Sequence, residues 1–465
     1  MTVSPEPVRR PCWRRAAGIY LFLALSGGLT LLAVTPPMQV ADEWAHLDRA
    51  WSLANGTWVG EGMGGFVPES LHRLFEDTAA RFGEPLPRPQ PLDDWLKLLG
   101  DLSALGISDS PPRFVGFPTV LYSPVPYAGM SAGVAIAQEF SDRPLVLLYA
   151  GRLGALLVAV GLTVWAISIA PFGKWFFALL ALTPVALLQA SGMNADGMTL
   201  SLALLLAAGV VRAGYGTEAV GTAQILLLAL TATALALCKQ AYLPLALAVW
   251  LIPGTRFRSA RHRCAARWGI PLLAAAAMAA WTALALRHHY QPPRPGTDAF
   301  AQLAWIAGQP LDYLATLGRD LARNGENYVR QMIATVGYPE IPASSLLVLA
   351  QLAALWLAAR HGGPASEPIG AGRRSWALLV MLGGGVWIMT LLYVWWTPVG
   401  GRFVEGVQGR YFLPLLALLP LAAAGRSSPR QQRRGERLVV VAFWFWGGFS
   451  VAHTVNRVIS HYYAF

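Results

Sequence analysis

Long apolar runs recur along almost the whole chain, and they constrain its fold more than any other feature. A transmembrane helix needs about 20 mostly apolar residues. Runs of about this length, some shorter, follow one another between polar segments, so the sequence predicts an all-α polytopic membrane protein. The predicted spans are residues 17–35, 145–168, 175–192, 197–212, 219–237, 241–253, 268–286, 343–359, 375–395, 411–424 and 438–455.

Composition also favours a membrane protein over several soluble domains. Of the 465 residues, 55% are hydrophobic and only 13% are charged. The formal net charge is +11, but the basic residues lie in short loops between apolar runs, so the charge does not indicate nucleic-acid binding. The cysteines show no spacing typical of a disulfide framework or a zinc site.

The basic loops set the predicted topology, because Lys and Arg prefer the cytoplasmic side. The basic segments are 1–16, which precedes a retained signal anchor, and 255–267, 360–374 and 425–437. All four face the cytoplasm only if the weakly apolar segment 121–140 is a half-inserted periplasmic helix. We therefore expect one integral-membrane domain with eleven spans, a cytoplasmic N-terminus and an external C-terminus.

This topology places three segments outside, namely 36–143, 287–342 and 396–410. The first two contain amphipathic stretches, such as 298–324, that suit helices lying along the membrane surface. No internal repeat is visible in the sequence, which argues against an inverted-repeat transporter.

The stretch PPMQVADEWAHLDRA (36–50) carries charged residues directly after the first apolar run. In a helix over 41–51, Asp42, His46 and Arg49 fall on one face, and Glu43 is next to Asp42. A carboxylate at a membrane boundary is partly desolvated, which suits it to accept a proton. The alternatives are an acidic helix start paired locally with Arg49, and a metal site that uses Asp42 and His46.

Two further polar sites fall on predicted external turns. Asn194 and Asp196 either face a polar cavity or cap the following helix. Lys239 either meets an anion, such as a lipid phosphate, or reaches the interface with its long side chain.

A third polar site is the last predicted external loop. It contains Arg402, Glu405, Gln408 and Arg410 beside glycines and aromatic residues. Arginine binds phosphate with two parallel hydrogen bonds, so this loop is a candidate phosphate-binding site. The alternative is ordinary loop polarity.

Five short motifs between residues 17 and 455 carry a family resemblance. They are PPMQVADEWAH (36–46), Tyr122–Pro124, Asn194–Gly197, GYPEIP (337–342) and QGRYFLP (408–414). Together they resemble a bacterial family of uncharacterised predicted membrane proteins that is usually placed in the GT-C superfamily of glycosyltransferases. The resemblance implies a GT-C-like bundle with periplasmic juxtamembrane helices in the bacterial inner membrane.

The same resemblance implies transfer of a sugar from a polyprenyl phosphate or diphosphate to a cell-envelope glycan or lipid. It places the catalytic base at Asp42, with Glu43 beside it and Asp196 as a second acidic residue. We expect Lys239, Arg402, Gln408 and Arg410 to bind the donor phosphate. His46, Arg49, Asn194 and Tyr411 are expected to support the site.

Two questions stay open from the sequence. One is whether a divalent cation, Mg²⁺ or Mn²⁺, is bound through Asp42 and Asp196. The other is whether the chain is instead a transporter, a flippase or a non-catalytic subunit of a polysaccharide assembly and export system.

Overall fold

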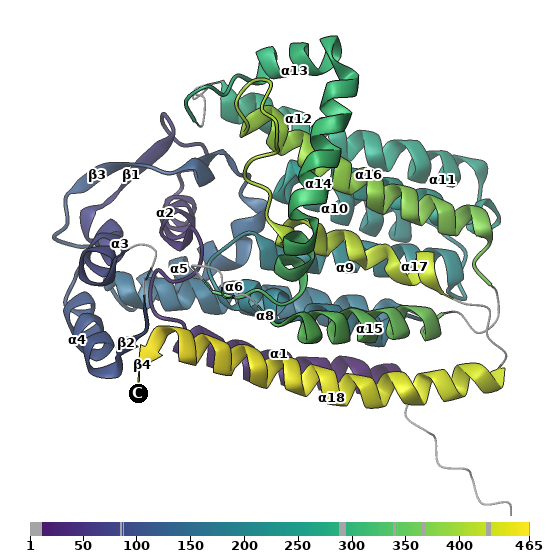
Figure 1. Ribbon diagram of the computed structural model, residues 1–465, viewed down its shortest axis with the longest axis horizontal. Helices are drawn as coiled ribbons and strands as arrows, with labels where there is room; N and C mark the ends of the chain where they lie inside the picture. The colour runs from purple at the N-terminus through teal and green to yellow at the C-terminus, as the bar shows by residue number, and fades with distance from the viewer. Residues whose placement is uncertain are drawn as a thin grey trace, which may run out of the picture.

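The computed structural model describes residues 12–83, 86, 88–287, 294–337, 341, 343–363, 368–424 and 429–464. It is mostly helical, and its long helices run side by side (Figure 1). The chain between α1 (Cys12–Val34) and α6 (Pro144–Ile169) gathers at one end of this bundle, which we call the α2 end. One large core of buried apolar side chains runs through the bundle.

Six helices in the described part of the chain are long and apolar enough to cross a membrane. They are Ala16–Val34 of α1, α6, α9 (Asp196–Tyr215), Ala260–Leu286, α16 (Ala371–Trp395) and Leu438–Tyr462 of α18 (Pro429–Tyr462). Residues Ala260–Leu286 comprise α11 (Ala260–Cys264), η5 (Ala265–Gly269) and α12 (Ile270–Leu286). The predicted polytopic membrane protein is therefore confirmed.

A seventh crossing is possible through a bent pair of helices. α7 (Lys174–Ala181) and α8 (Pro184–Ser191) meet at 66°. Pro184 lacks a backbone N–H, so it begins a new helix more readily than it continues one. Thr183 caps α8, because its hydroxyl accepts a hydrogen bond from the Ala186 N–H.

The other four predicted spans are short apolar helices. They are α10 (Thr222–Cys238), η3 (Gln240–Leu251), α15 (Ser345–His361), and η6 (Gly409–Leu418) continued by α17 (Leu419–Ala423). Pro244 in η3 and Pro414 in η6 each remove a backbone donor, which disrupts regular α-helical bonding. All eleven predicted segments overlap helices, but length and composition support six or seven crossings, so eleven stays a prediction.

The segment expected to be half-inserted forms no full span. It contains η1 (Pro118–Leu121), η2 (Val125–Tyr127) and the eleven-residue α5 (Ala128–Gln138). α5 packs closely on the first half of α6, since a Cβ on Gly129 would lie 2.5 Å from the Gly154 carbonyl oxygen. These glycines therefore allow the two backbones to touch.

The α2 end is built from short helices and two small sheets. The helices are α2 (Glu43–Ala54), α3 (Glu69–Phe82) and α4 (Leu92–Ser103). β1 (Gly64–Pro68) pairs antiparallel with β3 (Pro112–Gly116), with Gly64 opposite Gly116. β2 (Gln90–Pro91) pairs in parallel with β4 (Tyr463–Ala464), which follows α18.

The predicted surface helix over 298–324 is two helices. α13 (Ala299–Gly308) and α14 (Pro310–Ile333) are separated at Gln309, and α14 runs crosswise to the bundle (Figure 1). The basic turn η4 (Gly254–Arg256) and α11 lie at the end of the bundle opposite α2.

A buried ion pair fixes the chain where α1 ends. Glu43 and Arg152 are both fully buried, and their side chains form two hydrogen bonds of 2.7 and 2.6 Å. The Arg152 guanidinium also donates to the carbonyls of Leu32, Thr35 and Pro36. α6 is thereby tied to the end of α1.

The carboxylate of Glu43 accepts two further hydrogen bonds. The backbone N–H of Met38 donates to Oε2 at 3.0 Å, and that of Met193 donates to Oε1 at 3.3 Å. The chain between α1 and α2, residues 35–42, is called the α1–α2 linker below. The pair therefore connects α6, this linker and the turn before α9. A buried ion pair survives only when its remaining polar atoms are satisfied, as they are here.

We expect Arg152→Leu to lower the free energy of unfolding by about 3–5 kcal/mol, because it leaves a buried carboxylate without its cation. The control is Arg73→Gln, which removes an exposed pair with Asp77 and should cost less than about 1 kcal/mol. Unfolding of the purified protein in detergent measures both. Equal losses in the two variants would contradict this role.

Candidate functional site

Asp42 occupies a strained and exposed position. Its φ of 59° and ψ of 18° lie in the left-handed region, which non-glycine residues seldom adopt. Its side chain is exposed and makes no capping hydrogen bond to α2. The expected partial desolvation of this carboxylate is therefore not seen. The carboxylate is instead accessible to a substrate.

Glu43 points the opposite way. Its pairing with Arg152 and two backbone N–H groups occupies both oxygens, and no part of the side chain is exposed. The adjacent carboxylates therefore have different surroundings. The Glu43 carboxylate holds Arg152 and the backbone around it, and the Asp42 carboxylate is the one that solvent can reach.

His46 and Arg49, which follow Asp42 in α2, are both buried. His46 Nδ1 is 2.8 Å from the Tyr127 hydroxyl, and burial, with the nearby charge of Lys239, lowers the pKa of His46 to about 3. Arg49 donates to the carbonyls of Trp58 and Tyr122 at 2.9 and 3.0 Å. Thus Arg49 holds backbone segments together rather than pairing with a carboxylate.

Asp196, Lys239 and Arg410 come together from three distant parts of the chain. Asp196 begins α9, Lys239 joins α10 to η3, and Arg410 lies in η6. Asp196 Oδ1 pairs with Lys239 Nζ, and Oδ2 lies 3.1 Å from Arg410 Nε. The three side chains are 14–17% exposed, so the cluster is mostly buried but reachable. It contains one more cation than anions.

Aromatic side chains surround this cluster. Lys239 Nζ lies 4.8 Å from the Tyr411 ring centre, and the Tyr242 hydroxyl donates to the Tyr411 carbonyl at 3.0 Å. Burial raises the pKa of Tyr122, whose hydroxyl also feels the charges of Lys239, Asp196 and Asp42. Tyr122 thus lies within electrostatic reach of both Asp42 and the Asp196 cluster.

Asn194 caps the start of α9. Its Oδ1 accepts hydrogen bonds from the N–H groups of Asp196 and Gly197, and its Nδ2 donates to the Gln189 carbonyl. This is the capping role considered from the sequence. It also fixes where Asp196 stands.

Arg402 and Gln408 lie differently relative to the cluster. Arg402 is exposed on the loop before η6, and Lys239 and Arg410 are the described cations within ion-pair distance of Asp196. Gln408 is half-buried and precedes Arg410 by two residues. The structure therefore brings Gln408 to the site and leaves Arg402 outside it.

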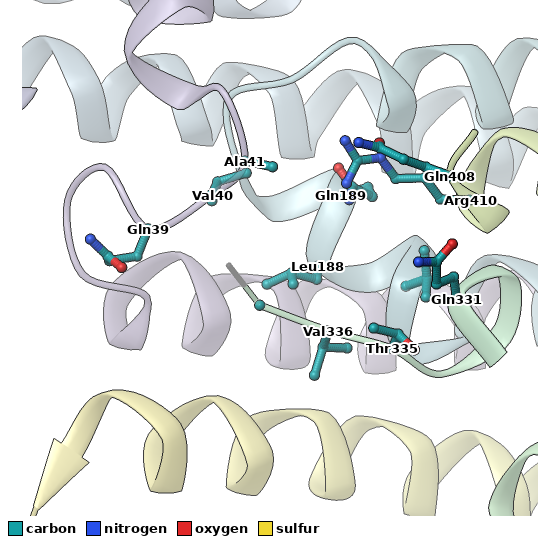
Figure 2. Close-up of a pocket in the computed structure, with 12 residues that line it drawn as sticks. Gln39, Val40, Ala41, Leu188, Gln189, Gln331, Thr335, Val336, Gln408 and Arg410 are labelled. Carbon is teal, nitrogen blue, oxygen red and sulfur yellow. The ribbon is translucent and has the colours of Figure 1, made fainter. Parts of the chain in front are cut away.

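A narrow polar pocket lies between the α1–α2 linker and η6 (Figure 2). Gln189 and Gln408 are beside Arg410 in this view, and Ala41, next to Asp42, forms part of the wall. The pocket is lined by Gln39, Val40, Ala41, Val185, Leu188, Gln189, Gln331, Thr335, Val336, Gly337, Gln408 and Arg410. Of the GYPEIP motif, residues 338–340 and 342 lie outside the described residues.

The described residues do not fit a divalent cation at Asp42 and Asp196. They contain no group of three or more His, Cys, Asp or Glu side chains that could hold a metal ion. Both oxygens of Asp196 are already engaged by cationic side chains, which a metal would have to displace. No step of the chemistry below therefore uses a metal.

Several residues of the site were not among those predicted from the sequence. They are Tyr127, Tyr242 and Gln189, which contact or surround predicted residues. Gln189 carried a signal, because it is a polar residue within an apolar run. The tyrosines carried little, since their role depends on contacts between distant segments.

Comparison with known proteins gives one positive result. The family model described as "Predicted membrane protein (DUF2142)" matches residues 25–419, which include all the candidate site residues. No curated protein and no solved structure matches the chain. Since the family model covers most of the sequence, the chain belongs to this family of predicted membrane proteins.

Proposed function

We propose that this protein is a GT-C-type glycosyltransferase. It transfers a sugar from a polyprenyl phosphate or diphosphate to a cell-envelope glycan or lipid. The observation that carries the proposal is an exposed carboxylate, Asp42, next to a pocket that Arg410 also lines. Such a transfer requires a base and a cation for the leaving phosphate, and we assign these roles to Asp42 and Arg410.

The reaction is a single displacement. Asp42 accepts the proton of an acceptor hydroxyl, whose oxygen then forms a bond with the anomeric carbon of the donor sugar. The bond between that carbon and the phosphate oxygen breaks, and the phosphate leaves with the electron pair. The configuration of the anomeric carbon is inverted.

The Asp196 cluster suits the leaving phosphate. Two cations share one anion, so the cluster keeps one positive charge in a mostly buried place. Charge–charge attraction is stronger there than in bulk water, and negative charge grows on the phosphate as the bond breaks. Lys239 and Arg410 are held in place by Asp196 and the Tyr411 ring, so they need not reorganise.

The arrangement of the bundle supports a periplasmic site in the bacterial inner membrane. The arginine-rich turn at η4 and α11 lies opposite the α2 end (Figure 1). Basic loops prefer the cytoplasm, which puts Asp42 outside. With the four short apolar helices counted as crossings, the chain crosses eleven times, as its basic loops require.

We predict that Asp42→Asn lowers sugar transfer by at least about 100-fold, because a general base contributes roughly 10²–10⁴ to rate. Asparagine tolerates the left-handed backbone, so the fold should be kept. The product is first identified by mass spectrometry of surface glycans and glycolipids from a deletion strain. It is then quantified in strains that carry each variant.

Asp93→Asn is the matched control, because Asp93 is another exposed aspartate of the same segment, at the start of α4. It should restore wild-type product. Wild-type product from a normally folded Asp42→Asn or Asp42→Ala protein would remove Asp42 from the mechanism. That result would favour a transporter or a non-catalytic subunit.

A second prediction separates two arginines. Arg410→Gln should weaken binding of undecaprenyl phosphate by about tenfold or more, since hydrogen bonds to charged groups contribute roughly 1.5–3 kcal/mol. Arg402→Gln, on the exposed loop, should have little effect. Titration of the purified protein with this lipid measures both, and equal weakening would contradict the assignment of the phosphate site to the Asp196 cluster.

A further inference from the structure

The end of α18 and strand β4 provide a second set of contacts to the end of α1 and the α1–α2 linker. The Tyr462 hydroxyl donates to the Gln39 carbonyl at 2.8 Å, and the Tyr463 hydroxyl donates to the Val34 carbonyl at 3.0 Å. Tyr462 is fully buried. Both acceptors belong to the short stretch of chain that leads from α1 to Asp42.

The two tyrosines are themselves fixed by α4. The indole N–H of Trp95 donates to the Tyr462 carbonyl at 2.9 Å, and Tyr463 pairs with Gln90 between β4 and β2. Trp95 is buried and packs on the Phe82 ring, with 4.4 Å between ring centres. Tyr462 and Tyr463 therefore connect the α4 region to the end of α1 and the linker.

The linker needs such support, because its backbone is strained at two places. Met38 and Asp42 both have positive φ values, of 62° and 59°. Strained conformations persist only where the surroundings enforce them. Arg152 holds the Pro36 carbonyl and Glu43 holds the Met38 N–H, and Tyr462 adds a contact at Gln39, closer to Asp42.

We infer that Tyr462 and Tyr463 are positioning residues that fix the α1–α2 linker and hence the direction of the Asp42 carboxylate. The inference rests on the proposed function for its effect on catalysis. Both tyrosines lie outside residues 25–419, the part of the chain that the family model matches. Both hydroxyls bind backbone carbonyls, so the two tyrosines act through the backbone that they hold.

The test uses Tyr462→Phe, which removes one hydroxyl and keeps the ring. Ala41→Cys reports on the linker, in a full-length chain whose native cysteines are replaced. We expect its reaction with a water-soluble maleimide to accelerate roughly two- to tenfold, as for the loss of one hydrogen bond. The melting temperature should change little.

Tyr20→Phe is the matched control, because Tyr20 is another buried tyrosine, on α1 within the bundle. It should leave the labelling rate unchanged. If Tyr462→Phe fails to fold, Trp95→Phe loosens the same end through α4 and keeps both tyrosine hydroxyls. It should raise the labelling rate above that of the reporter chain with Trp95 and Tyr462 intact, and an unchanged rate would overturn the positioning role.

Transfer by the enzyme with its native cysteines gives a second readout. Tyr462→Phe should lower kcat by about tenfold or more, since small misplacements of a catalytic group are costly. The KM for the lipid-linked donor should change less than kcat, because the ion pairs of the Asp196 cluster are kept. A merely destabilised protein would lose active molecules in proportion to its loss of folded protein.

The outcomes separate the two hypotheses. An unchanged labelling rate at position 41 in folded Tyr462→Phe overturns the positioning role, whatever the activity. Faster labelling with lower kcat supports both the positioning role and the mechanism. A third outcome is faster labelling in Tyr462→Phe when the wild-type protein itself shows no sugar transfer. It supports the positioning role of the tyrosines and overturns the proposed function.

Discussion

The buried pair between Glu43 and Arg152 is the interaction on which the rest of this site depends. Its two hydrogen bonds lie where the apolar helix α1 gives way to the polar segment. Arg152 also binds three carbonyls at the end of α1, so it fixes the direction in which the linker leaves that helix. That course turns Asp42 outward while its neighbour is enclosed.

The Asp196 cluster is a second anchor with a different electrostatic character. Charged side chains at membrane depth are tolerated when they are paired, and Asp196 meets this condition for two cations at once. The Glu43–Arg152 pair is neutral and closed, whereas the Asp196 cluster keeps one positive charge and some exposure. The closed pair therefore suits a structural role, and the open cluster suits an anionic ligand.

How much the sequence could predict depends on how local each property is. Hydrophobic runs reflect local burial, so all eleven predicted segments overlap helices, and the basic loops indicated that α5 is not a span. Proline shortened or altered η3 and η6, which hydrophobicity alone does not show. Asn194 caps α9, which is one of the two roles considered from the sequence. This role could be predicted because a cap involves only residues close in sequence.

The partners of the charged residues could not be predicted in the same way. Arg152 is 109 positions from Glu43, and no local pattern joins them. Arg49 was considered as the partner of a nearby carboxylate, yet it binds carbonyls of two other segments. Arg402 and Arg410 were both expected to bind the donor phosphate, but Arg410 pairs with Asp196 whereas Arg402 is exposed on the loop before η6.

The strained backbone at Asp42 argues for a chemical role over a structural one. A left-handed non-glycine residue costs on the order of 1–3 kcal/mol, and glycine would adopt the same conformation without that cost. The Asp42 carboxylate does not cap α2 and does not join the Arg152 pair, so the fold gains nothing evident from it. An aspartate at such a position, exposed and beside a pocket that Arg410 lines, supports the proposal that its carboxylate acts on a substrate.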